Sequence, residues 1–545
     1  MRRFLAATLT AVITFGPLVS ANAAPVKPPA KSAPGEPATP IKHLVIIFQE
    51  NVSFDHYFGT YPNATNPAGE PAFNPLPNTP AVNGILGTLS TNNPNLNPAN
   101  GQGATNPFRL DRSQAATSDQ DHDYTPEQMA FDGGIMDLFP ANTGVPGPPP
   151  GGGGILGTSG LVMGYYDGNT VTALWNYAQS FAMSDNSYNT NFGPSTPGAL
   201  DLVAGQTNGV TQNLNGTGAI IGDGNGGYSV ISDADPLGDV CSTTTGEVFQ
   251  MGGQNIGDLL NAAGVSWGFF EGGFDLTVVN PNGSTGCNRS TTSLITGQNK
   301  KDYIPHHQPF QYYASTANLQ HTRPTSVMTI GQAGDAGNHQ YDSHDFFDAV
   351  SAGNFPAVTF LKAPGYQDGH AGYSDPIDEQ KFIVDTINFL SQRPEWASTA
   401  VVINYDDSDG WYDHQLGQIV NTSQTSADGL NGTGFCGTGL PQLDGISAPH
   451  AQGRCGYGPR IPMMVISPYA RQNYVDHTMT DQSSIIRFVE DNWLNGQRIG
   501  HGSFDTIANS IASMFAFVQP SSCLRYELLD DNTGLVTQKG CVARQ

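Results

Sequence analysis

Polar side chains that could bind a cation directly follow two strongly apolar segments of the chain. Glu50 and Asn51 come after HLVIIFQ, and Asp406 and Asp407 come after AVVINY. Two adjacent carboxylates at a strand end are costly to desolvate together unless a cation compensates their charge. Oxygen ligands suit one hard divalent ion, which favours calcium, magnesium or manganese and leaves zinc and iron open. Asp and Asn after strands also cap helices or close turns, so each cluster alone has this second interpretation.

A candidate nucleophile lies in the segment NFGPSTPG, where Ser195 is flanked by glycine and prolines. Such a turn could expose the Ser195 hydroxyl at the start of a helix, where free backbone N–H groups favour a phosphate. Coordination to a metal lowers the pKa of a hydroxyl and so activates it to attack phosphorus. An ordinary Ser/Thr helix cap is the alternative for this turn taken alone.

Several histidines lie in polar segments marked by Gly or Pro, outside any apolar helical face. Imidazole or imidazolium could bind phosphoryl oxygens, and one histidine could protonate a departing alkoxide. A lone histidine in a loop more often only makes hydrogen bonds. The candidates are His122, His307, His370 and His414, with Asp409 near the last. His43 is assigned to packing on the first expected strand, and His306 is the less favoured member of its pair.

Short apolar segments alternate with segments of helical periodicity. This alternation predicts the strands and helices that position the candidate residues. Buried strands alternating with helices predict an α/β fold, with a mainly parallel sheet covered on both faces. Ligands of such sheets bind beyond the carboxyl ends of the strands, so the polar clusters should converge there. His370, in the segment DGH after one strand, should join them. Strands are expected at 43–49, 265–270, 357–361, 400–405 and 461–466, and helices at 170–183, 378–392 and 482–493.

The N-terminus has the features of a cleaved export signal. Met1-Arg2-Arg3 precedes a mostly apolar run that ends near Val19, and Ala21-Asn22-Ala23 fits a cleavage site. A membrane anchor is the alternative, but the run is short and interrupted by Thr, Gly and Pro. We therefore expect a signal peptide at 1–23, a Pro-rich linker at 24–40 and one catalytic domain at 41–545, with irregular excursions near 60–110, 141–158 and 421–458.

Charge and cysteine content narrow the class of protein further. The formal net charge of −25 disfavours nucleic acid and anionic membranes as partners. It would also repel a phosphate ester unless a bound cation reverses the local sign. An even number of cysteines in an exported chain favours disulfides. Pairing of sequential neighbours is our hypothesis, because the last two pairs would close short loops; the cysteines are Cys241, Cys287, Cys436, Cys455, Cys523 and Cys541.

Eight segments, in order from residue 41 to about 495, resemble the phosphoesterase family that contains bacterial phosphocholine-type phospholipases C and acid phosphatase A. They are ENVSFDHYFG, DHDYTPEQMAFDGGIMDLF, NFGPSTPGAL, DYIPHHQPFQYYAST, DGHAGYSDP, VVINYDDSDGWYDH, RIPMMVISPYA and DHTMTDQSSIIRFVEDNW. The resemblance implies an alkaline-phosphatase-like three-layer α/β/α sandwich with long loop insertions. One departure is Val52, where the family often has a basic residue.

The same resemblance implies roles for individual residues. It places one metal ion on Glu50, Asn51, Asp406, Asp407 and the nucleophilic Ser195. It also implies a phosphate pocket lined by His122, His307 and His370, with His370 as candidate proton donor to the leaving group. His414 and Asp409 match family positions and are given a supporting role only.

These observations predict an exported, periplasmic or extracellular, metal-dependent phosphoesterase with a serine nucleophile. Hydrolysis of phospholipid phosphodiesters, as in phospholipase C, is slightly favoured over phosphomonoester hydrolysis by an acid phosphatase. A non-catalytic, secreted, acidic metal-binding protein is the alternative from another class. A purely structural ion has no need of the Ser195 hydroxyl, which argues against it. No nucleic acid partner and no integral membrane association are expected.

Overall fold

The computed structural model describes residues 35–147, 153–518 and 523–543, all within the unit Ser32–Gln545. The expected signal peptide lies outside the described residues, as does the first part of the Pro-rich linker. The described end of that linker contacts the domain, because the Ala38 N–H donates to the Asn492 carbonyl at 2.7 Å. Among the helices in the described part of the chain, none is long and apolar enough to span a membrane.

An eight-stranded sheet forms the centre of this unit. The first five strands in its order are mutually parallel, β17 is antiparallel to both of its neighbours, and β4 and β18 are parallel to each other. This confirms the expected mainly parallel sheet. The order is β14 (Gln340–Asp342), β11 (Trp267–Glu271), β15 (Val358–Lys362), β1 (His43–Gln49), β16 (Thr399–Tyr405), β17 (Met463–Ile466), β4 (Ala182–Ser184) and β18 (Tyr474–Asp476).

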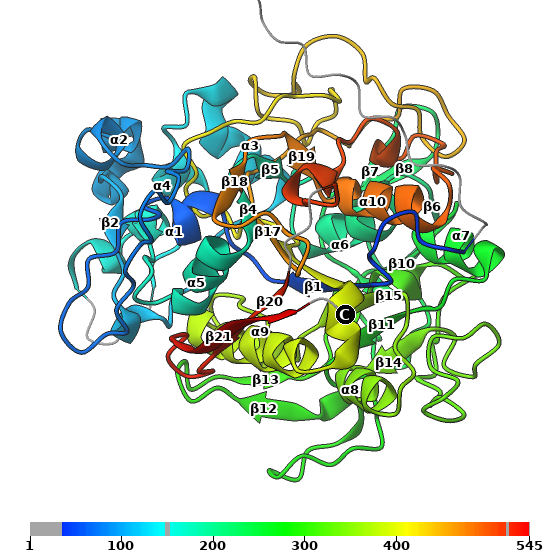
Figure 1. The fold of residues 1–545 in the computed structure, drawn as a ribbon. Coiled ribbons are helices and arrows are strands. Elements are labelled where there is room, and N and C mark those ends of the chain that lie inside the picture. Colours follow the sequence, from blue (N-terminus) through cyan, green and yellow to red (C-terminus); the bar gives the residue numbers. More distant parts are fainter. Residues whose placement is uncertain (1–34, 148–152, 519–522, 544–545) are drawn as a thin grey trace, which may run out of the picture. The chain divides into compact units, whose positions relative to one another are not determined.

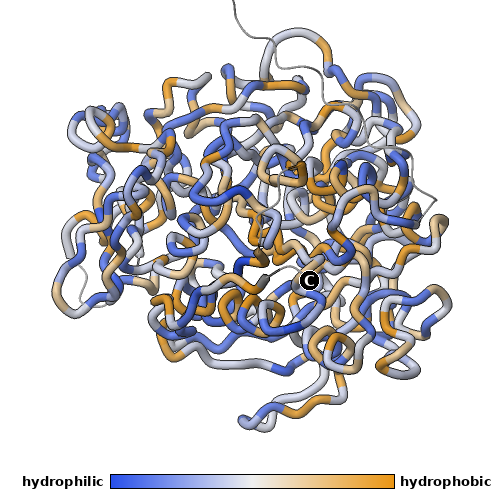
Figure 2. Tube along the Cα trace, viewed as in Figure 1, coloured by the Kyte–Doolittle hydropathy of each residue, from blue (hydrophilic) through white to orange (hydrophobic). Residues whose placement is uncertain are grey.

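Helices cover both faces of the sheet, so the fold is an α/β/α sandwich (Figure 1). One side carries α5 (Thr172–Ser180), α8 (Ser343–Ser351) and α9 (Pro376–Ser391). The other side carries α6 (Ser195–Ala204), α7 (Ile256–Ala263) and α10 (Ser483–Trp493). Hydrophobic residues concentrate along the central strands (Figure 2), and β15 and β16 are buried along their whole length, as a sheet covered on two faces requires.

The helix expected at 170–183 is partly wrong. Helix α5 ends at Ser180, and Ala182–Ser184 is strand β4. β4 pairs with β17 on one side and with β18 on the other, so its backbone hydrogen bonds lie within the sheet. Tertiary pairing has overridden the local helical pattern here. The other expected strands and helices are present, with ends that differ by one or two residues.

Smaller elements surround the sandwich. Short helices are α1 (Phe54–Phe58), α2 (Thr88–Thr91), α3 (Tyr124–Phe131) and α4 (Phe139–Asn142). The small sheets are β6 (Val210–Leu214) with β10 (Val248–Met251) and β9 (Asp235–Pro236), β7 (Ile220–Gly222) with β8 (Tyr228–Val230), β12 (Ser290–Thr292) with β13 (Asn299–Lys301), β2 (Phe108–Arg109) with β3 (Gly164–Tyr165), β5 (Ser187–Tyr188) with β19 (Thr480–Asp481), and β20 (Cys523–Leu529) with β21 (Val536–Ala543).

Disulfides tie down three of these peripheral regions. The bonds join Cys241 to Cys287, Cys436 to Cys455 and Cys523 to Cys541. The hypothesis of sequential pairing is therefore confirmed. The second bond lies within the expected excursion at 421–458, and the third joins β20 to β21.

Arg460 holds together the segments that leave the carboxyl ends of the central strands. Its guanidinium is fully buried and lies 3.0 Å from the Asp55 carboxylate in α1 and 3.1 Å from that of Asp413. Its Nη1 also donates to the carbonyls of Asn83 and Asp185, at 2.7 and 2.9 Å. Arg460 thus links the chain after β1 to the chain after β16 and after β4.

We expect Arg460→Met to lower the free energy of unfolding by about 3–5 kcal/mol, because it leaves two buried carboxylates without their cation. Denaturant unfolding followed by circular dichroism measures this. Arg471→Met is the matched control, since Arg471 is exposed, and it should cost less than about 1 kcal/mol. Equal stability of the Arg460 variant and wild type would contradict the linking role.

Candidate active site

The ends of three neighbouring strands converge, as expected. The Glu50 N–H, just after β1, donates to the Asp368 carbonyl at 2.8 Å. The Val52 N–H donates to the Asp407 carbonyl at 3.1 Å. These backbone hydrogen bonds bring the segments after β1, β15 and β16 to one place at the carboxyl edge of the sheet, where ligands of open α/β sheets bind.

Ser195 is the first residue of α6, and its hydroxyl points into this convergence. Its Oγ lies 3.2 Å from Glu50 Oε2 and 3.3 Å from Asp407 Oδ2. The close approach depends on Gly198, because a Cβ at that position would lie only 2.0 Å from the Asp406 carbonyl oxygen. Gly198 therefore lets the first turn of α6 pack against the end of β16.

Asn51 lies between the carboxylates and the histidines. One terminal atom of its amide is 2.8 Å from Glu50 Oε2 and 2.9 and 3.2 Å from the two Asp406 carboxylate oxygens. The other terminal atom is 3.2 Å from His370 Nε2. With nitrogen toward the carboxylates, the amide donates to them. In the opposite orientation its oxygen completes a set of converging oxygens, which is favourable only around a cation.

The carboxylates of this cluster are almost completely withdrawn from solvent. Asp406 and Asp407 are 1% and 0% exposed. Burial, followed by the neighbouring Glu50, raises the pKa of both well above the ordinary value. Lys362, at the end of β15, forms an ion pair with Glu50. One ammonium leaves the three carboxylates under-compensated, so the oxygen-rich donor set fits a divalent cation.

The three predicted phosphate-pocket histidines surround this cluster. His307 Nδ1 lies 3.2 Å from Glu50 Oε1, and burial lowers the pKa of His307 well below its ordinary value. His122 Nδ1 lies 3.4 Å from Asp409 Oδ1. Burial alone would lower the pKa of His122, but the Asp409 and Asp119 carboxylates outweigh it and raise the pKa to about 10. His122 is therefore a fixed positive charge facing His370, with 5.9 Å between the ring centroids.

His370 differs from His122 in its protonation. Its Nδ1 lies 2.6 Å from the Ala371 carbonyl oxygen, to which it donates, so that in the neutral ring Nε2 carries the lone pair. Burial, and then the positive charge of His122, lowers the pKa of His370 well below the ordinary value. The neutral form is favoured until a negative charge enters the pocket.

The remaining histidines of the sequence analysis make other contacts. His414 Nδ1 lies 2.6 Å from Asp55 Oδ2, within the network around Arg460. His306 Nδ1 lies 3.4 Å from Asp235, and its ring meets that of His307 edge-on. His43 stacks on Phe355, which agrees with its assignment to packing.

Sequence reasoning missed three residues that contact the site. Lys362 pairs with Glu50, and the Tyr373 ring stacks on His370 with 4.3 Å between centroids. Lys300 Nζ lies 3.5 Å from the centroid of the Tyr373 ring. A lysine at the end of the fully buried, largely apolar strand VTFLK was the signal available for Lys362. The local sequence around Lys300 carries no comparable signal.

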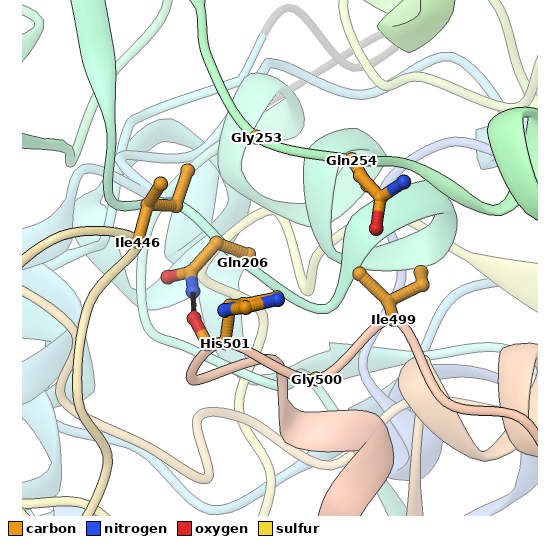
Figure 3. A pocket seen from close by; sticks show the side chains of 7 residues that line it. All are labelled: Gln206, Gly253, Gln254, Ile446, Ile499, Gly500 and His501. Atoms are coloured by element: carbon orange, nitrogen blue, oxygen red, sulfur yellow. Dashed lines mark hydrogen bonds between the residues drawn. The ribbon is translucent and has the colours of Figure 1, made fainter.

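A cavity of about 310 Å³ opens beside His122 and Pro194. Four aspartates also line it: Asp119, Asp121, Asp123 and Asp233. Asp233 accepts a hydrogen bond of 2.8 Å from the Thr196 N–H at the start of α6. Pro194, the residue before Ser195, thus lies in the wall of a cavity rich in carboxylates. A second cavity, of about 260 Å³, is lined by Gln206, Ile446 and His501 among others, and none of its lining residues belongs to the predicted site (Figure 3).

The sequence profile of the Phosphoesterase family matches residues 41–494, most of the chain. The chain belongs to this family. Its relatives include the non-hemolytic phospholipase C of Pseudomonas aeruginosa, which is 26% identical over 90% of this chain and 59% of that protein. Phospholipase C A of Mycobacterium tuberculosis is 24% identical over 90% of this chain and 80% of that protein. The chain thus spans 59% of the Pseudomonas relative and 55% of a Burkholderia pseudomallei relative.

Solved structures superpose on this chain only with low TM-scores. A protein in the alkaline phosphatase superfamily from Vibrio parahaemolyticus is 12% identical, covering 68% of this chain and 76% of that one, with a TM-score of 0.26. Murine ectonucleotide pyrophosphatase/phosphodiesterase 5 is 12% identical, covering 63% of this chain and 94% of that one, with a TM-score of 0.30.

We expect Asp407→Asn to be at least as stable as wild type in metal-free buffer, because it removes one of several crowded negative charges. A divalent ion should then raise the Tm of wild type but not of the variant. At about 100 times its dissociation constant, a bound ion stabilises the folded state by about 2.7 kcal/mol. Differential scanning fluorimetry with magnesium, calcium, manganese and zinc measures both effects.

Asp348→Asn, on the exposed side of α8, is the control for loss of a carboxylate and should respond to the ion as wild type does. An Asp407 variant that is stabilised by the ion as strongly as wild type would contradict the assignment of Asp407 as a ligand.

Proposed function

We propose that this protein is a metal-dependent phosphoesterase in which Ser195 is the nucleophile. The observation that carries the proposal is the position of the Ser195 hydroxyl, within 3.3 Å of two buried carboxylates at the start of α6. Three further observations support it: the under-compensated charge of the cluster, the fixed cation His122, and membership of the Phosphoesterase family.

The proposed metal ligands are Glu50, Asn51, Ser195, Asp406 and Asp407. A divalent ion bound there lowers the pKa of a coordinated hydroxyl and polarises a phosphoryl oxygen. Lys362 pairs with the Glu50 carboxylate, and the backbone around Gly198 keeps the Ser195 hydroxyl against the end of β16.

In the proposed reaction the Ser195 hydroxyl loses its proton to solvent, its oxygen attacks phosphorus, the bond to the leaving alcohol breaks, and a phosphoserine forms. Water then gives a proton to His370, attacks the same phosphorus and releases the Ser195 oxygen. His122 binds a phosphoryl oxygen as a permanent imidazolium. His370 protonates the leaving alkoxide once the negative charge of the substrate has raised its pKa. His307 contacts the Glu50 carboxylate and keeps that carboxylate oriented in the pocket.

Phospholipid phosphodiesters are the proposed substrates, and phosphomonoesters are the second candidate. The four aspartates around the cavity favour the diester, because a diester carries one negative charge and a monoester dianion carries two. The same aspartates also favour a headgroup that bears a positive charge and stays on the phosphate when the alcohol leaves. Relatives named as phospholipases C support this choice.

Export to the periplasm or the medium is part of the proposal. The Met1–Ala23 segment has the composition of a signal peptide. The three disulfides also suit an oxidising compartment, because cytosolic thiols are kept reduced.

We expect Ser195→Ala to lower kcat by at least about 10³-fold while leaving the free energy of unfolding within about 1 kcal/mol of wild type. Hydrolysis of p-nitrophenylphosphorylcholine and of p-nitrophenyl phosphate, each followed from pH 4 to 9, measures activity and compares the two substrate classes. Ser483→Ala is the matched control, because Ser483 is the buried first residue of another helix, α10. A fully active Ser195 variant would refute the nucleophile. A higher kcat/KM for the monoester would replace the phospholipase proposal with that of a phosphatase.

A further inference from the structure

The segment 276–301 includes neither Asp nor Glu, although the whole chain has 47 of them. Longer stretches, such as 71–110 and 303–334, also lack both, so the exposed side chains of this segment carry the argument. Three basic residues, Arg289, Lys300 and Lys301, lie within or next to the β12–β13 hairpin that ends this segment. The hairpin lies at the lower edge of Figure 1, beyond α9.

The tip of this hairpin presents apolar side chains to solvent. Leu294 is 95% exposed and Ile295 is 41% exposed. The turn is nevertheless held in place, because the Ser293 hydroxyl donates to Asp378 at 2.7 Å and accepts from the Thr296 N–H at 3.0 Å. A turn fixed with a leucine pointing outward is not explained by packing within this chain.

A third exposed apolar residue belongs to the turn that lies beside the base of the hairpin. Val279 is 63% exposed. The side chain of the next residue, Asn280, donates to the Ser290 carbonyl of β12 at 3.0 Å, which fixes this turn against the hairpin. Because Ser290 pairs with Lys301, Val279 lies beside the base of the hairpin and not at its tip.

The hairpin also adjoins the proposed catalytic pocket. The Thr296 hydroxyl donates to the Tyr373 carbonyl at 3.2 Å, and Lys300 lies over the Tyr373 ring. That ring stacks on His370. In the same loop, Gly372 approaches Asp119, which lines the cavity. A surface that touched the hairpin tip would therefore lie next to the site.

We propose that the β12–β13 hairpin docks the protein on the surface of a zwitterionic phospholipid aggregate, so that the pocket beside it receives its substrate from that surface. The inference rests on the proposed function. Leu294 and Ile295 enter the interface, and Lys301, at the base of the hairpin, meets the lipid phosphates. Charge and position favour this occupant: the net charge of −25 disfavours an anionic surface, and the pocket beside the hairpin takes a phospholipid in the proposed function.

The test is flotation of the full chain with phosphatidylcholine vesicles. A Ser195→Ala background keeps the lipid from being consumed. We expect the double substitution Leu294→Asp and Ile295→Asp to reduce the vesicle-bound fraction at least about fivefold. In the otherwise wild-type chain, the same double substitution should leave hydrolysis of the soluble p-nitrophenylphosphorylcholine within about twofold of wild type. Leu440→Asp, at a leucine that is 62% exposed in another loop, is the matched control and should bind vesicles as wild type does.

Three outcomes would overturn the docking proposal. They are failure of the Ser195→Ala chain to bind the vesicles, equal binding by the hairpin variant, and conversion of a dimer to a monomer by the hairpin substitutions, seen by sedimentation velocity. The last would assign the tip to a second copy of the chain. Failure of the proposed function would give a different result from failure of the docking proposal: vesicle binding would persist, but the wild-type chain would hydrolyse no ester.

Discussion

The structure depends on the crowding of buried carboxylates around one hydroxyl. Glu50, Asp406 and Asp407 approach one another in a region almost free of solvent, with the Lys362 ammonium beside Glu50. Burying these carboxylates on folding costs free energy, because each charge loses its hydration and repels the others. In the proposed function a divalent ion would offset this cost, and Ser195 lies where that ion would act on its proton. The proposed metal binding and the proposed catalysis would then both follow from one electrostatic constraint.

The rest of the fold maintains this crowding. Parallel strands β15, β1 and β16 deliver three polar segments to the same edge of the sheet. Arg460 ties together the chain that leaves that edge, and Gly198 allows α6 to approach β16. Asn51 adopts a left-handed backbone conformation, with φ of 40°, directly after Glu50. Such a conformation is uncommon outside glycine and is often found at functional sites.

Much of this arrangement could be predicted from the sequence. Apolar runs that end in Glu50-Asn51 and Asp406-Asp407 indicated both the strands and the edge at which they end, because buried parallel strands have a strong local signature. The role of Lys300 in β13 and of Tyr373 could not be predicted, because it arises from contacts between segments far apart in the chain. Strand β4 was mistaken for the end of a helix for the same reason: its partners β17 and β18 lie nearly 300 residues further along the chain. The protonation of the histidines is also a property of the folded state. His122 gains a raised pKa from Asp409 and Asp119, and His370 a lowered one from burial.

Location of the bound ion tests the account most directly. Crystals grown with manganese, with diffraction recorded at an energy where manganese scatters anomalously, would show the position of the ion without reference to activity. We expect one anomalous peak, bounded by the side chains of Glu50, Asn51, Ser195, Asp406 and Asp407. A peak between Glu50, His307 and Asp368 instead, which also lie close together, or beside His122 and Asp409, with none near Ser195, would contradict it.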